Sequence, residues 1–227
     1  MKQAIIAVLA IVVIIGAAVT LGKKDDQTTG STPSNNVYGN EQAAVTIVEY
    51  ADFECPGCGS IHPIVTAIKE EFKDRVKFEF RHFPLVQIHA NATAAHRAAE
   101  AAAKQGKFWE MHDKLYENQA TWKQSNSASG IFEDYAQEIG LDAEQFKTDV
   151  AASSTLATIN ADVALGKDDN VDSTPTFFIN GKKVEDTASI ATVEKFRKVV
   201  QEALGENTAT TQTAEEATAE ETQPTEQ

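Results

Sequence analysis

The sequence predicts an α/β fold that is interrupted by a block of helices. Residues 45–51 and 76–83 have the composition of strands, and a segment with helical spacing lies between them. A short hairpin and a last helix follow much later, over residues 176–204. Residues 85–168 show helical patterns and no strand pattern. Strands that alternate with helices are typical of an α/β sheet, so the long helical stretch is predicted to be an insertion.

A pair of cysteines lies at the first junction between strand and helix. Cys55 and Cys58 are the only cysteines among 227 residues. The strand before them is rich in β-branched and aromatic residues, and Pro56 suits the first turn of the helix after them. Apolar residues then recur at helical spacing: Ile61, Ile64, Val65, Ile68 and Phe72.

This position predicts a reactive thiol. Cys55 would lie at a helix N-terminus, where free backbone N–H groups favour a thiolate, and Cys58 follows one turn later to resolve a mixed disulfide. The alternative is half of a zinc site, which needs two more ligands. The sequence has no third cysteine, and its histidines are scattered without a metal-binding pair: His62, His82, His89, His96 and His112. The redox interpretation is therefore favoured.

The remaining elements follow the same patterns. The second strand stops at Pro84, and Asn180-Gly181 predicts a two-residue hairpin turn within 176–184. Ser189 is expected to cap the last helix, which runs to about residue 204. The helices expected in the insertion cover residues 89–106, 107–118, 132–139, 143–151 and 155–166, and the fourth has Asp142 as its N-cap.

Composition limits the possible functions. The length fits one domain with an elaboration. The net charge of −14 argues against nucleic-acid binding, because few cations are available to neutralise phosphates. The absence of any cysteine outside the pair suits an oxidising compartment, where a stray thiol would mispair.

The two ends of the chain differ in composition from the middle. Ala4–Leu21 is almost wholly apolar and is flanked by lysines, so residues 1–22 are predicted to be an uncleaved transmembrane signal anchor. Cleavage after the run 16–19 remains the alternative. Residues 23–36 are polar and are expected to form a flexible tether, and the acidic residues 206–227 a disordered tail. The catalytic domain is then expected outside the cytoplasm, anchored to the membrane, or secreted if the signal is cleaved.

Three motifs in combination resemble one family. They are Cys55-Pro56-Gly57-Cys58, the helix proline Pro63, and the segment 173–181, S-T-P-T-F-F-I-N-G. Together they resemble DsbA-type thiol:disulfide oxidoreductases, which have a thioredoxin fold with an inserted helical domain. The resemblance covers about residues 37–204. It implies a thioredoxin-like domain from 37–84 and 169–205, and a helical insert from 85–168.

The resemblance implies a role for each matching residue. Cys55 is the attacked or attacking sulfur, and Cys58 is the buried resolving sulfur. Pro175 is expected to be cis beside the disulfide. The backbone of Thr174 is expected to pair with an extended substrate chain, and Pro56 and Gly57 to contact it. Glu49 matches the family's buried acid that moves protons, whereas the plainer alternative is an ordinary charge at a strand end.

The implied activity is the introduction of disulfides into translocated proteins. The implied partners are reduced, unfolded or folding secreted proteins and a quinone-linked membrane protein, DsbB- or VKOR-like, that reoxidises the pair. We expect a monomer without a metal or a cofactor. The alternatives are an isomerase or reductase, which would lack a dimerisation domain here, and a redox-inert or metal-carrying binding module.

Two departures from the family bear on the strength of oxidation. Gly57 stands where the archetype has a histidine that stabilises the thiolate. Asp52 and Glu54 place acid near Cys55, which disfavours an anionic sulfur. Exposed acids are screened by water and salt, so we expect them to matter less than the helix end. The sequence therefore predicts an oxidase milder than the archetype.

Overall fold

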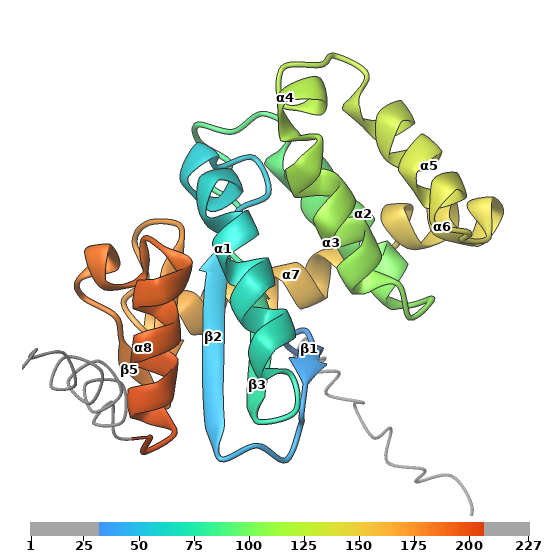
Figure 1. Ribbon diagram of the computed structural model, residues 1–227. Coiled ribbons are helices and arrows are strands. Elements are labelled where there is room, and N and C mark those ends of the chain that lie inside the picture. The colour runs from blue at the N-terminus through green and yellow to red at the C-terminus, as the bar shows by residue number, and fades with distance from the viewer. Residues whose placement is uncertain (1–31, 207–227) are drawn as a thin grey trace, which may run out of the picture. The chain divides into compact units, whose positions relative to one another are not determined.

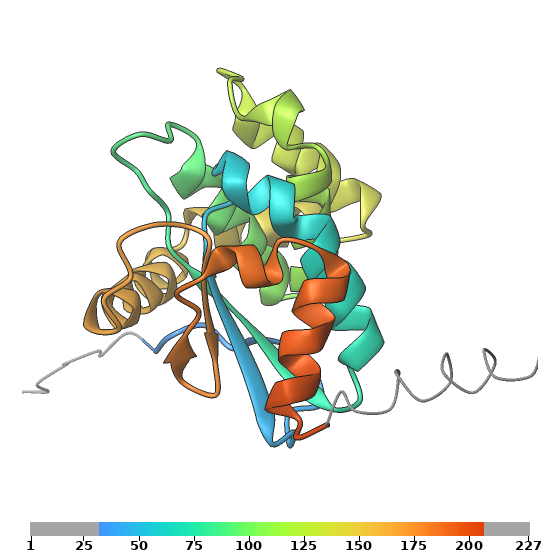
Figure 2. The same cartoon turned by 60° about the vertical axis from the view of Figure 1, so that its left-hand side comes forward.

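The strands form one mixed sheet. The computed structural model describes residues 32–206, in which a sheet of order β1-β3-β2-β4-β5 carries helices on both faces (Figures 1 and 2). β2 and β3 are parallel, and the other neighbouring strands are antiparallel. The strands are β1 (Asn36–Gly39), β2 (Val45–Ala51), β3 (Val76–His82), β4 (Thr176–Ile179) and β5 (Lys182–Lys183).

The predicted helices are present with different boundaries, and two further short ones, at 119–122 and 187–190, were not predicted. Those of the thioredoxin-like part are α1 (Pro56–Phe72), the 3-10 helix η1 (Thr187–Ile190) and α8 (Val193–Ala203). Those between β3 and β4 are α2 (Ala92–Ala103), α3 (Phe108–Glu117), α4 (Gln119–Trp122), α5 (Ala128–Glu138), α6 (Ala143–Ala151) and α7 (Ser153–Asp168). The predicted α/β fold with a helical insert is confirmed.

The alternation of β2 assigns its side chains to two layers. Val45 and Ile47 face α1 and α8, where they pack with Ile68 and Phe196 in one buried cluster. Tyr50 points to the other face, where it packs with partly buried residues of α7 and with other residues of the sheet. Glu49 shares the face of Ile47, so its carboxyl group lies under α1 in the interior.

The helical insert has a core that continues into the region of the cysteines. Its buried cluster joins α2, α3 and α5 with Phe53, Cys55, Cys58 and Phe80. Trp122 and Met111 are wholly buried in the same cluster. Because this core includes the residues next to the cysteine pair, the position of the insert and the position of the pair depend on each other.

The N-terminal end of the described chain differs from its prediction. The predicted tether, residues 23–36, includes Ser34 and Asn36, and both are buried. Ser34 Oγ donates a 2.6 Å hydrogen bond to Asp162, and Asn36 begins β1 at the edge of the sheet. A run of four residues is too short to show a strand pattern, and its polar side chains find their partners in distant elements.

Two predictions about the C-terminal part can be compared with the structure. Asn180 and Gly181 have φ of 50° and 75°, as the predicted hairpin turn requires. The predicted cap of the last helix is wrong, because Thr192 caps α8 by accepting from Lys195 N, whereas Ser189 lies in η1 and donates to Asp186 O.

Three sequence predictions concern residues outside the described range. The anchor at 1–22, most of the tether and nearly all of the acidic tail at 206–227 fall there. Among residues 32–206, none of the helices combines the length and the apolar character that a membrane crossing requires.

Candidate active site

Cys55 is held at the very start of a helix. It is the N-cap residue of α1, in extended conformation, and Pro56 occupies the first helical position. The Cys55 N–H donates to Asp52 O at 3.1 Å, and Gly59 N donates to Cys55 O at 3.1 Å. Cys55 therefore lies at the helix N-terminus, as the sequence predicts, beside N–H groups that have no partner within the helix.

These surroundings lower the pKa of the Cys55 thiol to about 5. The largest cause is a hydrogen bond with the thiol of Cys58, which outweighs the opposing effect of burial. The Thr174 side chain and the N–H groups of Cys58 and Gly57 add to it. In the neutral state the Cys55 thiol donates to Thr174 O at 3.3 Å, and Thr174 Oγ1 has no partner among the described residues. That hydroxyl is therefore free to donate to the thiolate.

Cys58 has the opposite character. Only 1% of its surface is exposed, and burial raises the pKa of its thiol, with further contributions from Cys55 and Glu49. The pKa values of the two thiols, one helical turn apart, are therefore displaced in opposite directions. A thiolate at Cys55 and a protonated thiol at Cys58 are the arrangement that thiol–disulfide exchange needs.

Glu49 is a buried acid beneath the pair. Burial raises the pKa of its carboxyl group to about 7, against the opposing charge of Lys69. Lys69 is itself buried in α1, and burial lowers the pKa of its ammonium group. Glu49 is therefore a buried carboxyl group with a pKa near neutral pH, and its charge contributes to the raised pKa of Cys58.

Pro175 lies directly against the reactive turn. The Thr174–Pro175 peptide bond is cis, as expected. A Cβ atom placed on Gly57 would lie 3.3 Å from Pro175 Cδ and 3.6 Å from Cys55 Sγ. Pro56 and Gly57 are exposed.

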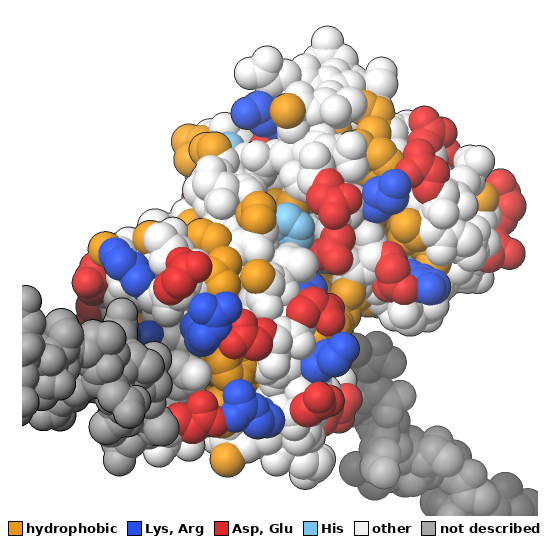
Figure 3. Space-filling model, viewed as in Figure 1, with side chains coloured by type: hydrophobic (Ala, Val, Ile, Leu, Met, Phe, Trp, Pro, Cys, Tyr) orange, Lys and Arg blue, Asp and Glu red, His pale blue; other side chains and the backbone are white. Residues whose placement is uncertain are grey.

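A cleft of about 410 Å³ opens beside this contact. Figure 3 shows apolar side chains at the surface between α1 and α8. The cleft lies between the first turns of α1 and the segments before β4 and α8, and its lining includes Gly57, Ile61, Ile64, Pro175, Phe177 and Ile190.

The expectation that the two acids near Cys55 are exposed to solvent is wrong. Asp52 is wholly buried and Glu54 is 8% exposed, so neither is a solvent-screened surface charge. Asp52 accepts hydrogen bonds from Leu85 N and His89 Nδ1, and Glu54 accepts one from Asn91 N. These partners come from a distant part of the chain, and the local sequence contains no signal for them.

Among the described residues, one group of possible metal ligands lies about one turn beyond Cys58 along α1. His62, His112 and Asp113 place ligand atoms within 4.8 Å of one another, and neither cysteine belongs to the group. Lys69 Nζ lies 3.8 Å from Asp113 Oδ1 and 4.2 Å from the centre of the Trp109 ring. An ammonium group already pairs with the carboxylate there, which disfavours a second cation at the same oxygen.

Fold and site together define a thioredoxin-fold protein with a reactive cysteine pair at a helix N-terminus. A family model described as Thioredoxin matches residues 31–202, and the chain belongs to this family. BdbD from Bacillus subtilis, in its oxidised form, is 26% identical with a TM-score of 0.65, covering 78% of this chain and 97% of its own. A thioredoxin-like oxidoreductase from Silicibacter pomeroyi is 28% identical with a TM-score of 0.61, covering 74% and 91%. The resemblance to DsbA-type thiol:disulfide oxidoreductases is confirmed.

Sequence relatives include proteins of a different description. A Na(+)/H(+) antiporter from Salinispora tropica is 40% identical over 149 residues, which is 66% of this chain. The chain spans about a fifth of the length of that relative, 22%. The similarity therefore concerns one segment of a much longer protein.

Proposed function

We propose that this protein introduces disulfide bonds into extracytoplasmic proteins through Cys55 and Cys58. The observation that carries the proposal is the opposite displacement of the two thiol pKa values, lowered to about 5 at Cys55 and raised at Cys58. A low pKa at Cys55 stabilises the reduced pair, so the disulfide gives up its bond readily and acts as an oxidant.

The reaction has two exchange steps. A substrate thiolate attacks Cys55 Sγ, the bond between Cys55 and Cys58 breaks, and Cys58 leaves as a thiolate that takes up a proton. A second substrate thiolate then attacks the substrate sulfur of the mixed disulfide and releases the Cys55 thiolate. Two electrons pass from the substrate to the pair, and the substrate gains one disulfide.

Glu49 supplies or removes the proton at Cys58. Because the pKa of its carboxyl group is about 7, it is protonated in part of the molecules at neutral pH and ionised in the rest. The protonated form donates to the departing Cys58 thiolate during oxidation of a substrate, and the ionised form accepts a proton when the pair is reoxidised.

The substrate chain binds beside Pro175. The backbone of Thr174 pairs with an extended chain, and the cleft under Pro175 accepts an apolar side chain of that chain. Pro56 and Gly57 are exposed at its edge and contact the same chain. The occupants are reduced, unfolded or folding secreted proteins, and a quinone-linked membrane protein that accepts electrons returns the pair to the disulfide. The protein works as a monomer.

Turnover with a reduced, unfolded protein tests the activity. We expect the loss of substrate thiols to be accelerated by the wild type and not by Cys55→Ser. With a disulfide-bonded protein in place of the reduced one, the Cys55 thiolate of Cys58→Ser should attack a substrate sulfur, displace the other substrate sulfur as a thiolate and accumulate as a mixed disulfide, because no second thiol releases it. Equilibration with glutathione should place the reduction potential above that of thioredoxin, about −270 mV. A potential as low as thioredoxin's would instead favour the reductase alternative.

Location needs a separate test. We propose that residues 1–22 anchor the protein with its catalytic domain outside the cytoplasm. Glu41 is exposed in the loop after β1, whereas Ser34 is buried, so Glu41→Cys is the suitable labelling site. In a background with both native cysteines replaced by serine, an impermeant thiol reagent should label intact cells. Labelling only after lysis would place the domain in the cytoplasm.

A further inference from the structure

The turn that carries Cys55 is fastened to other parts of the protein by the side chain of Asp52. Its Oδ1 accepts from Glu54 N at 2.9 Å, within the turn itself. Its Oδ2 accepts from Leu85 N and from His89 Nδ1, each at 2.7 Å, in the loop between β3 and α2. His96 Nε2, on α2, lies 3.5 Å from Oδ1. One wholly buried carboxylate therefore joins the turn, the loop and the insert.

Glu54 makes a second connection from the same turn. Its Oε2 accepts from Asn91 N at 2.7 Å, at the N-terminus of α2, where the N-cap side chain makes no capping bond. The Asn91 side chain donates to the carbonyl oxygens of Trp122, Lys123 and Ser125 beyond it. The turn is thus connected to α4 and the loop after it through Asn91, in addition to the direct bonds that Gln119 Nε2 of α4 donates to Phe53 O and Cys55 O.

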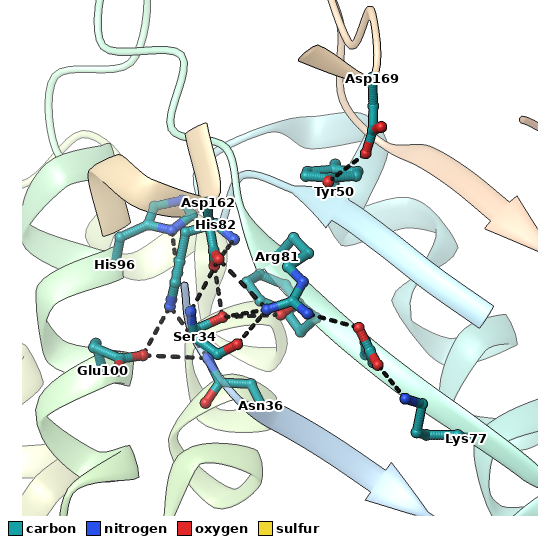
Figure 4. Close-up of polar contacts among 12 residues, drawn as sticks. Ser34, Asn36, Tyr50, Lys77, Arg81, His82, His96, Glu100, Asp162 and Asp169 are labelled. Atoms are coloured by element: carbon teal, nitrogen blue, oxygen red, sulfur yellow. Dashed lines mark hydrogen bonds and ion pairs between the residues drawn. The ribbon is translucent and has the colours of Figure 1, made fainter. Parts of the chain in front are cut away.

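Asp52 stays an acceptor because of the groups that face it. Burial tends to raise the pKa of its carboxyl group, but the neighbouring His96 ring and the hydrogen bonds from His89 Nδ1 and Leu85 N outweigh it and lower the pKa to about 2. The other ring nitrogen of His96 contacts a second histidine: His96 Nδ1 lies 2.7 Å from His82 Nδ1. His82 Nε2 in turn lies 3.0 Å from Glu100 Oε2. Figure 4 shows this part of the network, which continues through Asn36 on β1.

We propose that Asp52 and Glu54 are positioning residues for Cys55, which place its sulfur against the first N–H groups of α1 by fastening the reactive turn to the helical insert. Cys55 N is hydrogen-bonded to Asp52 O at 3.1 Å, so the turn transmits any displacement of Asp52 to Cys55. The proposal deepens the proposed function, and it rests on the thiolate of Cys55 and not on the direction of electron transfer.

The direction in which the pKa of Cys55 changes when either acid is replaced distinguishes a positioning role from a purely electrostatic one. Two negative charges near Cys55 disfavour a thiolate, so removing either charge would lower the pKa of Cys55 if charge were all that mattered. If the acids position the sulfur, losing their contacts moves it away from its donors and raises the pKa. Loss of one hydrogen bond to the charged sulfur should lower the thiolate population of Cys55 about tenfold at any pH below the pKa of its thiol.

The test is a thiolate titration of the full chain in the reduced state, by absorbance and by alkylation rate. We expect Asp52→Asn to raise the pKa of Cys55 by about one pH unit, because its amide would face Leu85 N–H as a second donor. Asp149→Asn is the matched control: Asp149 is also buried, on α6, and accepts from Gln145 Nε2 and Lys104 Nζ, neither of which touches the reactive turn. It should lower thermal stability and leave the pKa of Cys55 unchanged.

A pair of variants at Glu54 keeps the test decisive if Asp52→Asn does not fold. Glu54→Gln removes the charge and keeps an acceptor for Asn91 N, so the pKa of Cys55 should be unchanged. Glu54→Ala removes both and should raise it. A lowered pKa in Asp52→Asn, or in both Glu54 variants, would overturn the proposal in favour of electrostatics. No change in Asp52→Asn or Glu54→Ala would overturn it as well. A wild-type Cys55 that does not titrate low would count against the proposed function.

Discussion

Replacement of Glu49 by glutamine should stabilise the protein, and the gain should depend on pH in one direction. The carboxyl pKa is raised from 4.5 to about 7, chiefly by burial. Between these two values the folded state holds a proton that the unfolded state has released. Wild-type stability therefore falls as the pH rises from 4.5 to 7. Each pKa unit corresponds to 1.36 kcal/mol, so the full loss above pH 7 is about 3 kcal/mol.

Glutamine has a similar shape and does not titrate, so it removes this loss. We expect the free energies of unfolding of Glu49→Gln and the wild type to be similar near pH 4. Above pH 7 the variant should be more stable by about 3 kcal/mol. The assay is urea unfolding from pH 4 to pH 8 with Cys55 and Cys58 joined as a disulfide, so that neither sulfur titrates. The same variant should slow the step in which Cys58 loses its proton.

Glu79 is a matched control with the opposite sign. It lies on β3, 2.6 Å from Lys77 Nζ and 2.7 Å from Arg81 NH2. Burial tends to raise the pKa of its carboxyl group, but the bond from Lys77 and the charge of Arg81 outweigh it and lower the pKa. The stability that the ionised Glu79 carboxylate contributes is present at neutral pH and is lost as the pH falls through the pKa of this group in the folded state. Glu79→Gln should therefore be less stable than the wild type at pH 7. If Glu49→Gln shows the same pattern, Glu49 is an ordinary paired charge.

Three further outcomes are expected. At pH 6 iodoacetamide should modify Cys55 and not Cys58, because only Cys55 is then a thiolate, with a pKa of about 5; equal rates by peptide mapping would contradict the assignment. Gly57→His should make the pair more oxidising by about 30 mV or more in glutathione equilibration, since a histidine adds a donor to the thiolate. The Cβ of the new histidine would lie 3.3 Å from Pro175 Cδ, so a small shift of Pro175 is expected. An unchanged reduction potential would show that residue 57 does not determine the oxidising strength. Tyr116→Phe should leave the free energy of unfolding unchanged or raise it by up to about 1 kcal/mol, because the buried hydroxyl has no partner among the described residues; a clear loss would reveal one.

Local patterns were enough to predict the reactive pair. The apolar spacing after Cys58, the β-branched run before Cys55 and the position of Pro56 all depend on neighbours in the chain, and the structure places Cys55 at the helix N-terminus accordingly. The cis bond before Pro175 was expected from its resemblance to a family motif. The pairing of β2 with β4 joins residues about 130 positions apart, and local patterns contain no signal for it.

The polar interior was decided by tertiary structure. Asp52 and Glu54 were expected to be exposed, because an acid next to a helix N-terminus carries no local sign that a loop and a helix beyond β3 will cover it. Ser34 was expected in a tether for the same reason, and its partner Asp162 is 128 residues away. Most buried polar groups are satisfied by hydrogen bonds, and many of the partners here lie far away in the chain. Hydrophobic periodicity contains no information about such partners. The sequence by itself therefore determined where the reactive cysteines lie along the chain. Only the tertiary structure decided that the two acids beside them are buried and bonded to distant parts of the chain.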